Sequence, residues 1–408
     1  MLEETRIKQA AKEQEEYVIR MRRYFHEHPE NSMEEKETYR VITGELDQLG
    51  IPYETVGDYG IIGRLETGRP GKTLLLRSDM DALPTQESET NLKGKKVCVS
   101  GTPGVGHLCG HDGHMAVLLG AIRALNEMKE ELCGTVLFCF EQGEEGGWSI
   151  DAMLEALSRY HIDYAWGIHL YADLDCGKVS VQPGPRMASV AAFAVKVKGV
   201  GGHGSRPDLC VDPGACIVQI LAQVPSLLKA RIAPDRMVTF SVGNIQVGSK
   251  PNVIAEEGFF SGSLRFYDYG AGCQAMDIVC RVTEGLAAVH GCTVEYQRKL
   301  VCDTATINDP AMASVAARAA AKAVGEENVV ETEPWMATET FGRYLQRYPG
   351  VFAFVGIRNE ELGAGAGHHN PQFDLDERAL EKAVECTLFY AAELLKETDG
   401  TADAVAVK

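Results

Sequence analysis

The sequence predicts an α/β protein into which a second, α+β unit is inserted. Its 408 residues suit about two domains at roughly 100 to 200 residues each. Short apolar strand patterns alternate with helical patterns in the first half of the chain and return near its end. This alternation favours a mostly parallel sheet with helices on both faces. After the Pro-Gly-Pro sequence at residues 183–185 the order of the patterns changes.

The first pattern consists of short buried strands separated by helices. The expected strands are residues 74–77, 136–140, 164–169 and 351–357. The expected helices are residues 3–49, with a break at Pro29, and residues 115–128, 150–160, 310–324 and 377–395. We assign residues 1–186 and 299–408 to this domain.

The inserted unit, residues 187–298, has a different order of elements, β-α-β-β-α-β. Its expected strands are residues 189–198, 237–247, 258–266 and 293–298, and its expected helices are residues 213–228 and 271–290. A compact unit of roughly 110 residues with antiparallel strands follows from this order.

Composition and charge exclude several classes of protein. The chain carries 40 Lys and Arg against 58 Asp and Glu, a formal net charge of −18, and no local basic patch offsets it. We therefore expect no nucleic-acid partner and no membrane partner. No apolar run approaches the roughly 18 residues of a membrane span, and the N-terminus is a charged helical pattern rather than a signal peptide. Together with twelve cysteines that form no close Cys-x-x-Cys pair, these features predict a cytoplasmic protein with reduced thiols.

One ten-residue segment, residues 105–114, concentrates metal-binding side chains. It contains His107, Cys109, His111, Asp112 and His114. Cys109 and His111 come just before a predicted helix, where a turn can aim both side chains at one point. A thiolate and an imidazole suit a borderline-soft divalent ion, which would itself deprotonate the cysteine. The alternative is a loop in which histidines lie on the surface by chance.

Two adjacent carboxylates, Glu144 and Glu145, follow the strand predicted at residues 136–140. Adjacent carboxylates repel each other and need a compensating charge, which a divalent cation would supply. One glutamate can then bind the cation while its neighbour acts as a base, as metal-assisted hydrolysis requires. A solvated acidic loop is the alternative.

Further polar side chains follow other predicted strands. Asp79 and Asp81 follow the strand expected at residues 74–77, and His169 is the last residue of the strand expected at residues 164–169. His368 and His369 follow a glycine-rich stretch. The carboxyl ends of parallel strands share one edge of an open sheet, and ligands bind there. The alternatives are a structural histidine and aspartates that cap a helix or pair with a loop cation.

A glycine pattern at residues 199–204 matches G-x-G-x-x-G after a predicted strand, so a nucleotide-binding oxidoreductase must be weighed. Pro207 and Pro213 interrupt the helix that such a site requires. The sequence also lacks G-x-x-x-x-G-K-[ST] and G-x-S-x-G, the signals of a phosphate loop and of a serine hydrolase.

Ordered motifs along nearly the whole chain resemble the aminoacylase and zinc-carboxypeptidase amidohydrolases of metallopeptidase family twenty. The closest resemblance is to subfamily D, which holds hippurate hydrolases, N-acyl-amino-acid amidohydrolases and auxin-conjugate hydrolases. The motifs are residues 23–30, 78–84, 107–114, 143–145, 167–169, 201–207, 251–254 and 369–373. The resemblance implies a phosphorylase/hydrolase-like catalytic domain and an inserted ferredoxin-like lid and dimerisation domain.

The resemblance implies a pair of divalent ions with Cys109 as the bridging ligand. The implied ligands are Cys109, His111, Glu145, His169 and His369. Glu144 would be the general base, and Asp81 would orient the ligands. A histidine of related branches stands where this sequence has Asp79, which we do not expect to bind metal.

In the implied lid domain, His203 would reach the active site of a neighbouring subunit, so a homodimer or higher homo-oligomer is expected. Asn252 and Arg265 would hold the carboxylate of the substrate and the oxyanion. Two departures bear on substrate preference. Thr340 replaces an aspartate of the family pattern, and Trp148 stands where small residues are common.

The expected reaction is the hydrolysis of an amide. Two divalent ions carry +4, and the Cys109 thiolate and the Glu145 carboxylate leave about +2, so a bridging water would ionise near neutral pH. Glu144 would take its proton and deliver it to the departing nitrogen. A positive site attracts a carboxylate, which predicts N-acyl amino acids or short peptides as substrates. Zinc is expected, and manganese, cobalt or nickel are alternatives.

Two other functions stay open at this point. A dipeptidase or carboxypeptidase would share every metal ligand and differ only in the shape of its pocket. A non-catalytic protein that binds metal or a small molecule would have kept the fold without needing Glu144 as a base.

Overall fold

The computed structural model describes residues 3–146 and 149–396, and it divides into two compact units. The first unit comprises Met1–Gly184, Ile307–Thr332 and Tyr344–Lys408, and the second comprises Pro185–Thr306 and Glu333–Arg343. Trp148, for which we expect a role in substrate preference, lies outside the described residues.

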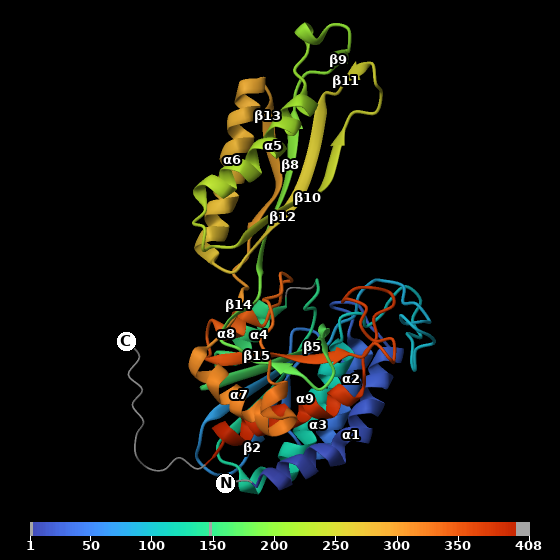
Figure 1. Ribbon diagram of the computed structural model, residues 1–408, viewed down its shortest axis with the longest axis vertical. Helices are drawn as coiled ribbons and strands as arrows, with labels where there is room; N and C mark the ends of the chain where they lie inside the picture. Colours follow the sequence, from blue (N-terminus) through green and yellow to red (C-terminus); the bar gives the residue numbers. More distant parts are fainter. Residues whose placement is uncertain (1–2, 147–148, 397–408) are drawn as a thin grey trace. The chain divides into compact units, whose positions relative to one another are not determined.

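The first unit is built on a seven-stranded sheet with the order β1-β2-β4-β3-β5-β15-β6 (Figure 1). Its strands are β1 (Tyr53–Val56), β2 (Gly60–Glu66), β3 (Thr73–Asp79), β4 (Thr135–Glu141), β5 (Tyr164–Asp175), β6 (Val179–Ser180) and β15 (Gly350–Arg358). The central strands β4, β3, β5 and β15 are parallel to one another, as predicted. The sequence did not predict the antiparallel hairpin β1–β2, which extends one edge of the sheet.

Helices cover this sheet and bury its apolar side chains. They are α1 (Glu4–Glu27), α2 (Lys36–Leu49), α3 (His111–Glu127), α4 (Ile150–Leu157), α7 (Pro310–Val324) and α9 (Arg378–Leu394). The short helix α8 (Gly342–Leu345) spans the point in the chain where the second unit ends and the first resumes. Helix α3 packs on β3 and β5, and α1 and α9 pack against α3. In the core between sheet and helices, Trp166 of β5 stacks on Tyr390 of α9 with ring centroids 4.5 Å apart. The predicted break near Pro29 is confirmed as the junction between α1 and α2.

The pairing of the parallel strands sets which residues share the carboxyl edge of the sheet. Asp79 pairs with Glu141, and Arg77 pairs with Gly167, so His169 lies level with Asp79. The expectation that His169 ends its strand is wrong, because β5 continues along β15 to Asp175. His169 nevertheless reaches the edge, since the pairing of β5 with β3 stops at Gly167.

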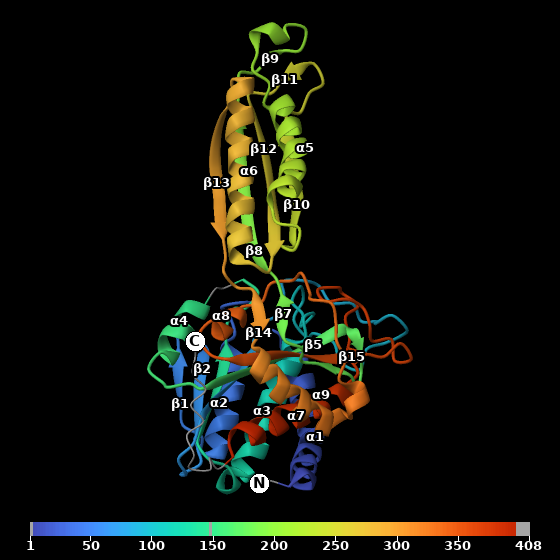
Figure 2. The same cartoon turned by 60° about the vertical axis from the view of Figure 1, so that its left-hand side comes forward.

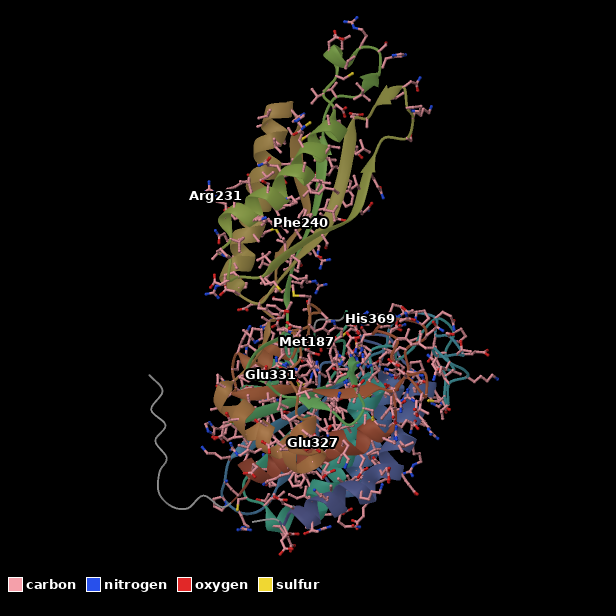
Figure 3. All side chains as sticks on the ribbon, viewed as in Figure 1. Met187, Arg231, Phe240, Glu327, Glu331 and His369 are labelled. Atoms are coloured by element: carbon pink, nitrogen blue, oxygen red, sulfur yellow. The ribbon has the colours of Figure 1, made fainter. Side chains whose placement is uncertain are left out.

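The second unit is a four-stranded antiparallel sheet, of order β10-β12-β8-β13, that carries two helices (Figure 2). Its main elements are β8 (Ser189–Lys198), α5 (Pro213–Arg231), β10 (Val238–Val247), β12 (Glu257–Phe266), α6 (Tyr269–His290) and β13 (Thr293–Val301). Sequence order and sheet order are those of a ferredoxin-like split βαβ unit. Its core includes Phe193 of β8, which stacks on Phe240, labelled in Figure 3, with ring centroids 5.6 Å apart.

The compact second unit extends past residue 298, where the sequence analysis set its end. Strand β13 continues to Val301 because residues 298–301 pair with Ala191–Ala194 of β8. The segment Glu333–Arg343 also belongs to this unit, since Trp335 exchanges backbone hydrogen bonds with residues 186 and 188. In the described part of the chain, no helix combines the length and apolar character needed to cross a bilayer.

Two glycines of α6 give a matched test of the packing in the second unit. A Cβ atom at Gly272 would lie 2.3 Å from the ring of Phe266, whereas a Cβ atom at Gly285 would meet nothing within 4 Å. Gly272→Ala should therefore destabilise the unit by about 1–3 kcal/mol through overpacking. Gly285→Ala should stabilise it by up to about 1 kcal/mol, because alanine favours the helix. Urea unfolding of both variants measures the difference, and equal effects would contradict the packing described.

Candidate metal centre

The candidate metal donors come from four segments that meet at the carboxyl edge of the first sheet. Cys109 and His111 flank Gly110, whose φ of 96° is a left-handed conformation that glycine adopts without strain. This turn places Cys109 just before α3 and His111 at its first residue. Glu145 follows β4, and His169 lies within β5.

The fourth segment, which follows β15, brings His369 to the same edge (Figure 3). The backbone N–H of His369 donates a hydrogen bond to the carbonyl of Leu108 at 2.8 Å. His369 itself has a φ of 65°, which is uncommon for a residue other than glycine. Such conformations cluster at binding sites, where the surrounding contacts maintain them.

Cys109 belongs to two of the three groups of candidate metal donors among the described residues, and the third group consists of Asp79, His111 and His114. Among the described residues, Cys109 forms one group with His111 and Glu145 and another with His169 and His368; the donor atoms of each group lie within 4.8 Å of one another. The Sγ atom of Cys109 lies 3.7 Å from Nε2 of His169. The predicted ligands Cys109, His111, Glu145 and His169 are thus brought together.

Backbone hydrogen bonds decide which ring nitrogen of each ligand histidine is available. Nδ1 of His111 lies 2.9 Å from the carbonyl oxygen of Asp81, and Nδ1 of His169 lies 2.9 Å from that of Leu170. A carbonyl oxygen only accepts, so each ring carries its proton on Nδ1 and keeps the lone pair of Nε2 for a cation. Nε2 of His111 faces Oε1 of Glu145 at 4.0 Å.

Backbone hydrogen bonds also distinguish His114 and His368 from the candidate ligands. Nε2 of His114 accepts the backbone N–H of Leu170 at 2.9 Å, and Nε2 of His368 accepts that of Ala172 at 3.1 Å. Because a backbone N–H only donates, the lone pair of each Nε2 is already engaged. Nδ1 of His114 in turn donates to Asp79 at 2.8 Å.

Asp79 also fits the expectation that it does not bind metal. It is fully buried, and Arg77 donates to its second oxygen at 2.8 Å. Burial raises the pKa of Asp79, but His111, His114 and Arg77 outweigh this effect and lower the pKa well below its usual value. Its charge is therefore neutralised within the protein itself.

Contacts of Glu145 favour a cation between donors. Oε1 of Glu145 lies 3.1 Å from Nε2 of His369, yet it accepts no hydrogen bond within the described part of the chain. A proton on Nε2 of His369 makes this contact an ion pair, and a divalent cation bound by both side chains would take the place of that proton. These residues therefore fit the metal-binding role expected of them.

The electrostatics of the centre lead to the same conclusion. Burial and Glu145 raise the pKa of the Cys109 thiol well above its ordinary value. Burial lowers the pKa of His111, but Asp79 and Cys109 outweigh it and raise the pKa well above its ordinary value. Without a cation the cluster thus retains protons, and a divalent ion would replace that positive charge.

Asp81 lies where a residue that orients the ligands is expected. Its carbonyl holds His111, and its carboxylate Oδ2 accepts the backbone N–H of Glu145 at 2.8 Å. The hydroxyl of Ser32 donates to the same oxygen at 2.6 Å. Ser32 lies close to the motif at residues 23–30, but no sequence pattern pointed to it.

The segments that carry His203 and Asn252 meet within the second unit. The short strands β9 (Gly202–His203) and β11 (Val253–Ile254) pair, and Gly204 donates to the carbonyl of Asn252 at 2.9 Å. Nδ1 of His203 accepts the backbone N–H of Ser205 at 3.1 Å, so the neutral ring carries its proton on the exposed Nε2. His203 is therefore arranged as a hydrogen-bond donor.

Arg265 lies on β12 of the second unit and donates to the hydroxyl of Thr338. Burial lowers the pKa of its guanidinium. Near Thr338, the side chain of Thr340 donates to the buried carboxylate of Glu339 at 3.3 Å. The threonine of the altered motif therefore binds its own neighbour.

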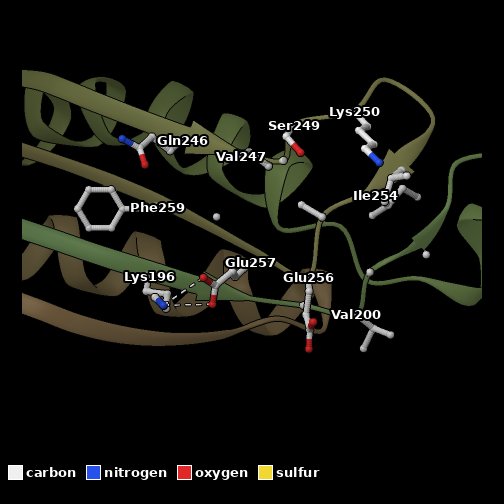
Figure 4. Close-up of a pocket in the computed structure, with 17 residues that line it drawn as sticks. Lys196, Val200, Gln246, Val247, Ser249, Lys250, Ile254, Glu256, Glu257 and Phe259 are labelled. Carbon is white, nitrogen blue, oxygen red and sulfur yellow. Dashed lines mark hydrogen bonds and ion pairs between the residues drawn. The ribbon is translucent and has the colours of Figure 1, made fainter.

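A groove of 970 Å³ runs beside the paired strands β9 and β11 of the second unit (Figure 4). The backbone of residues 199–202 and the ion pair between Lys196 and Glu257, at 3.1 Å, line it. None of the five predicted metal ligands lines the groove. The glycine pattern at residues 199–204 leads into β9 rather than into a helix, so it does not form a dinucleotide site.

Comparison with known proteins agrees with the site. The structure of Bacillus subtilis YXEP protein, described as a dinuclear metal binding peptidase from the M20 family, superposes with a TM-score of 0.78 at 30% sequence identity. The alignment covers 94% of this chain and 99% of that chain. Fold and donor cluster together define a metal-dependent hydrolase that acts on amide bonds, with a centre for divalent metal ions.

Residues 75–393 match Peptidase family M20/M25/M40, and the chain belongs to this family. It is 34% identical over 381 residues to thermostable carboxypeptidase 2 of Saccharolobus solfataricus, covering 92% of this chain and 95% of that relative. It is also 34% identical over 379 residues to N-acetylcysteine deacetylase of Bacillus subtilis, with the same coverage of 92% and 95%.

Replacement of the shared thiol tests the centre. Cys109→Ser should weaken metal binding by more than the roughly 10- to 100-fold that loss of an outer partner costs, because two of the candidate donor groups contain this sulfur. Cys139→Ser is the matched control, since Cys139 is equally buried but contacts the hydroxyl of Tyr344 instead. Metal content after dialysis, measured by plasma mass spectrometry, should fall only in the first variant. Equal retention in both would contradict the assignment.

Proposed function

We propose that this protein hydrolyses the amide bond of N-acyl amino acids, or of short peptides with a free carboxylate. The observation that carries the proposal is the thiol of Cys109 shared by two groups of metal donors, with Glu144 next to the donor Glu145. The relatives include an N-acetylcysteine deacetylase, which supports an N-acyl amino acid as substrate. The protein would thus be an amidohydrolase for small molecules.

We assign two divalent ions to each subunit, held by Cys109, His111, Glu145, His169 and His369. Cys109 would contact both ions, because its sulfur belongs to one donor group with His111 and Glu145 and also lies 3.7 Å from Nε2 of His169. A thiolate with neutral imidazoles favours zinc, whereas manganese, cobalt or nickel could occupy the same donors if they are more available. When bound, such ions lower the pKa of water and polarise a carbonyl group.

Glu144 would be the general base. It is half-buried and adjacent to the ligand Glu145, so its carboxylate can reach a water at the metal centre. It would take the proton of this water and later deliver it to the departing nitrogen of the amide. A carboxylate that alternates between these two roles needs a fixed position. The hydrogen bond from the backbone N–H of Glu145 to Asp81 restrains the backbone next to it.

The residues of the second unit would act on the substrate. His203 would donate its Nε2 proton to the oxyanion, and Asn252 and Arg265 would hold the carboxylate. We propose that this unit serves as a lid and dimerisation domain and that His203 acts in the active site of a neighbouring subunit. A cytoplasmic homodimer or higher homo-oligomer remains our expectation.

Peptide hydrolysis is the second candidate function. The similarity to a thermostable carboxypeptidase favours it. We expect both activities to use the same metal ligands, so the ligands do not separate them. A peptide substrate with a free amine needs an acidic partner in the pocket, whereas an acylated substrate does not. Activity on acetylated and free dipeptides of the same sequence separates the two functions.

The principal test is a substrate panel on protein stripped of metal and reconstituted with zinc, manganese, cobalt or nickel in turn. N-acetyl, N-benzoyl and indole-acetyl amino acids and free dipeptides should release amine only after metal is restored. Glu144→Gln should lower kcat by roughly 10²- to 10⁴-fold, because it removes the base without removing a donor. Metal content must stay equal to that of the wild type. No release on any substrate with metal bound would favour a binding protein instead.

The role of His203 across subunits has its own test. His203→Ala and Glu144→Ala chains should each be nearly inactive, and heterodimers formed by mixing them should regain activity at one of their two sites, which combines the intact Glu144 of one chain with the intact His203 of the other. Subunit exchange is verified by native mass spectrometry. Exchange without recovery of activity would contradict action across subunits.

A further inference from the structure

The loop that carries Glu144 is held from outside by the carboxylate of Glu35. Oε1 of Glu35 accepts the backbone N–H of Gly143 at 2.7 Å. Gly143 has a φ of 65°, a conformation that glycine adopts freely, so the residue before Glu144 is inherently flexible. The hydrogen bond from Glu35 restrains that flexible position.

A second carboxylate holds the other side of Glu144. The backbone N–H of Glu145 donates to Asp81 at 2.8 Å, and Asp81 is fixed by the hydroxyl of Ser32 at 2.6 Å. The residues directly before and after Glu144 are therefore both bound by carboxylates. Ser32 and Glu35 come from the same short connection between α1 and α2.

A residue directly before a helix often caps it, but Glu35 does not have this role. It precedes the first residue of α2, yet the carboxylate that caps this helix is that of Glu30, which accepts the backbone N–H of Glu37 at 3.0 Å and of Thr38 at 2.8 Å. Glu35 is completely buried, and its Oε2 atom has no hydrogen-bond partner among the described residues.

Burying this carboxylate is costly, and burial together with the nearby Asp81 raises the pKa of Glu35 to about 7. The neighbouring Met33 has a φ of 68°, an uncommon conformation for its residue type, so the backbone of this connection is also strained. Costly groups and strained backbone persist where other contacts require them. The hydrogen bond from Gly143 is the contact that ties Glu35 to the loop of Glu144.

We propose that Glu35 is a positioning residue that fixes the base loop, residues 143–145, and thereby the carboxylate of Glu144. The proposal rests on the proposed role of Glu144 as general base. A reacting group displaced by about 1 Å can lose on the order of 100-fold in rate, so a restraint on the preceding glycine matters for kcat. Glu35 itself would not contact the substrate.

The test compares Glu35→Ala and Glu35→Gln in the metal-loaded protein. Glu35→Ala removes the acceptor and should lower kcat roughly 10- to 100-fold with KM nearly unchanged. Glu35→Gln keeps an amide oxygen that can accept the Gly143 N–H, so it should recover most of the rate. Hydrogen exchange of peptides that contain Gly143 should speed up in Glu35→Ala and stay slow in Glu35→Gln.

Glu30→Ala is the matched control, because it removes a carboxylate from the same connection that caps α2 and does not bind the base loop. It should lower the melting temperature without slowing kcat. If Glu30→Ala and Glu35→Ala lose activity together, or if Glu35→Gln is as slow as Glu35→Ala, the proposal is wrong. Unchanged exchange at Gly143 in Glu35→Ala would also overturn it.

A failure of the proposed function is distinguishable from a failure of this inference. If Glu144→Gln were as active as the wild type, Glu144 would not be the base, and the function would fall. The exchange of Gly143 in the two Glu35 variants would still decide whether Glu35 holds the base loop.

Discussion

The metal centre of the first unit depends on one constraint: the buried Cys109 can lose its proton and act as a thiolate only beside positive charge, which a cation shared with its neighbours would supply. His169 of β5 and Glu145 of the loop after β4 each belong with this sulfur to a group of donor atoms that lie within 4.8 Å of one another. Each donor has a cost, since thiol, imidazole and carboxylate all lose hydration on burial. A divalent cation offsets these costs together, which explains why a protein would gather them at one edge of its sheet.

Around this cluster, backbone hydrogen bonds assign a role to each histidine. The rings of His111, His114, His169 and His368 lie close together. Of these four, only His111 and His169 have Nδ1 next to a carbonyl oxygen and therefore keep Nε2 for a cation. Behind the cluster, buried ions anchor the start of α3: Asp112, the residue after His111, accepts from Arg22 at 2.9 Å and lies 2.8 Å from Nδ1 of His26. The first residue of α3, His111, is thus a candidate metal ligand, and the second, Asp112, anchors the helix.

The sequence was sufficient to predict the elements with strong patterns. The central strands and the long helices follow from buried apolar runs and helical periodicity, and the predicted helix at residues 310–324 matches α7 at both ends. The hairpin β1–β2 was missed because it is short and its first strand has a single buried residue, Val56. Residue type and spacing also pointed to Cys109 and to the pair Glu144 and Glu145, and the family resemblance selected Glu145 as the expected ligand. They could not separate His114 and His368 from ligands, because that distinction depends on backbone partners contributed by β5, far away in the sequence.

The most direct test of the account is X-ray absorption of the cobalt-loaded protein together with its metal stoichiometry. A thiolate that bridges two ions gives about one sulfur neighbour for each cobalt, at about two cobalt ions per chain. A thiolate that binds only one of two ions gives about half a sulfur per cobalt. The account predicts the first result, and it should be lost in Cys109→Ser. The second result, or a single bound ion, would contradict the shared role of Cys109.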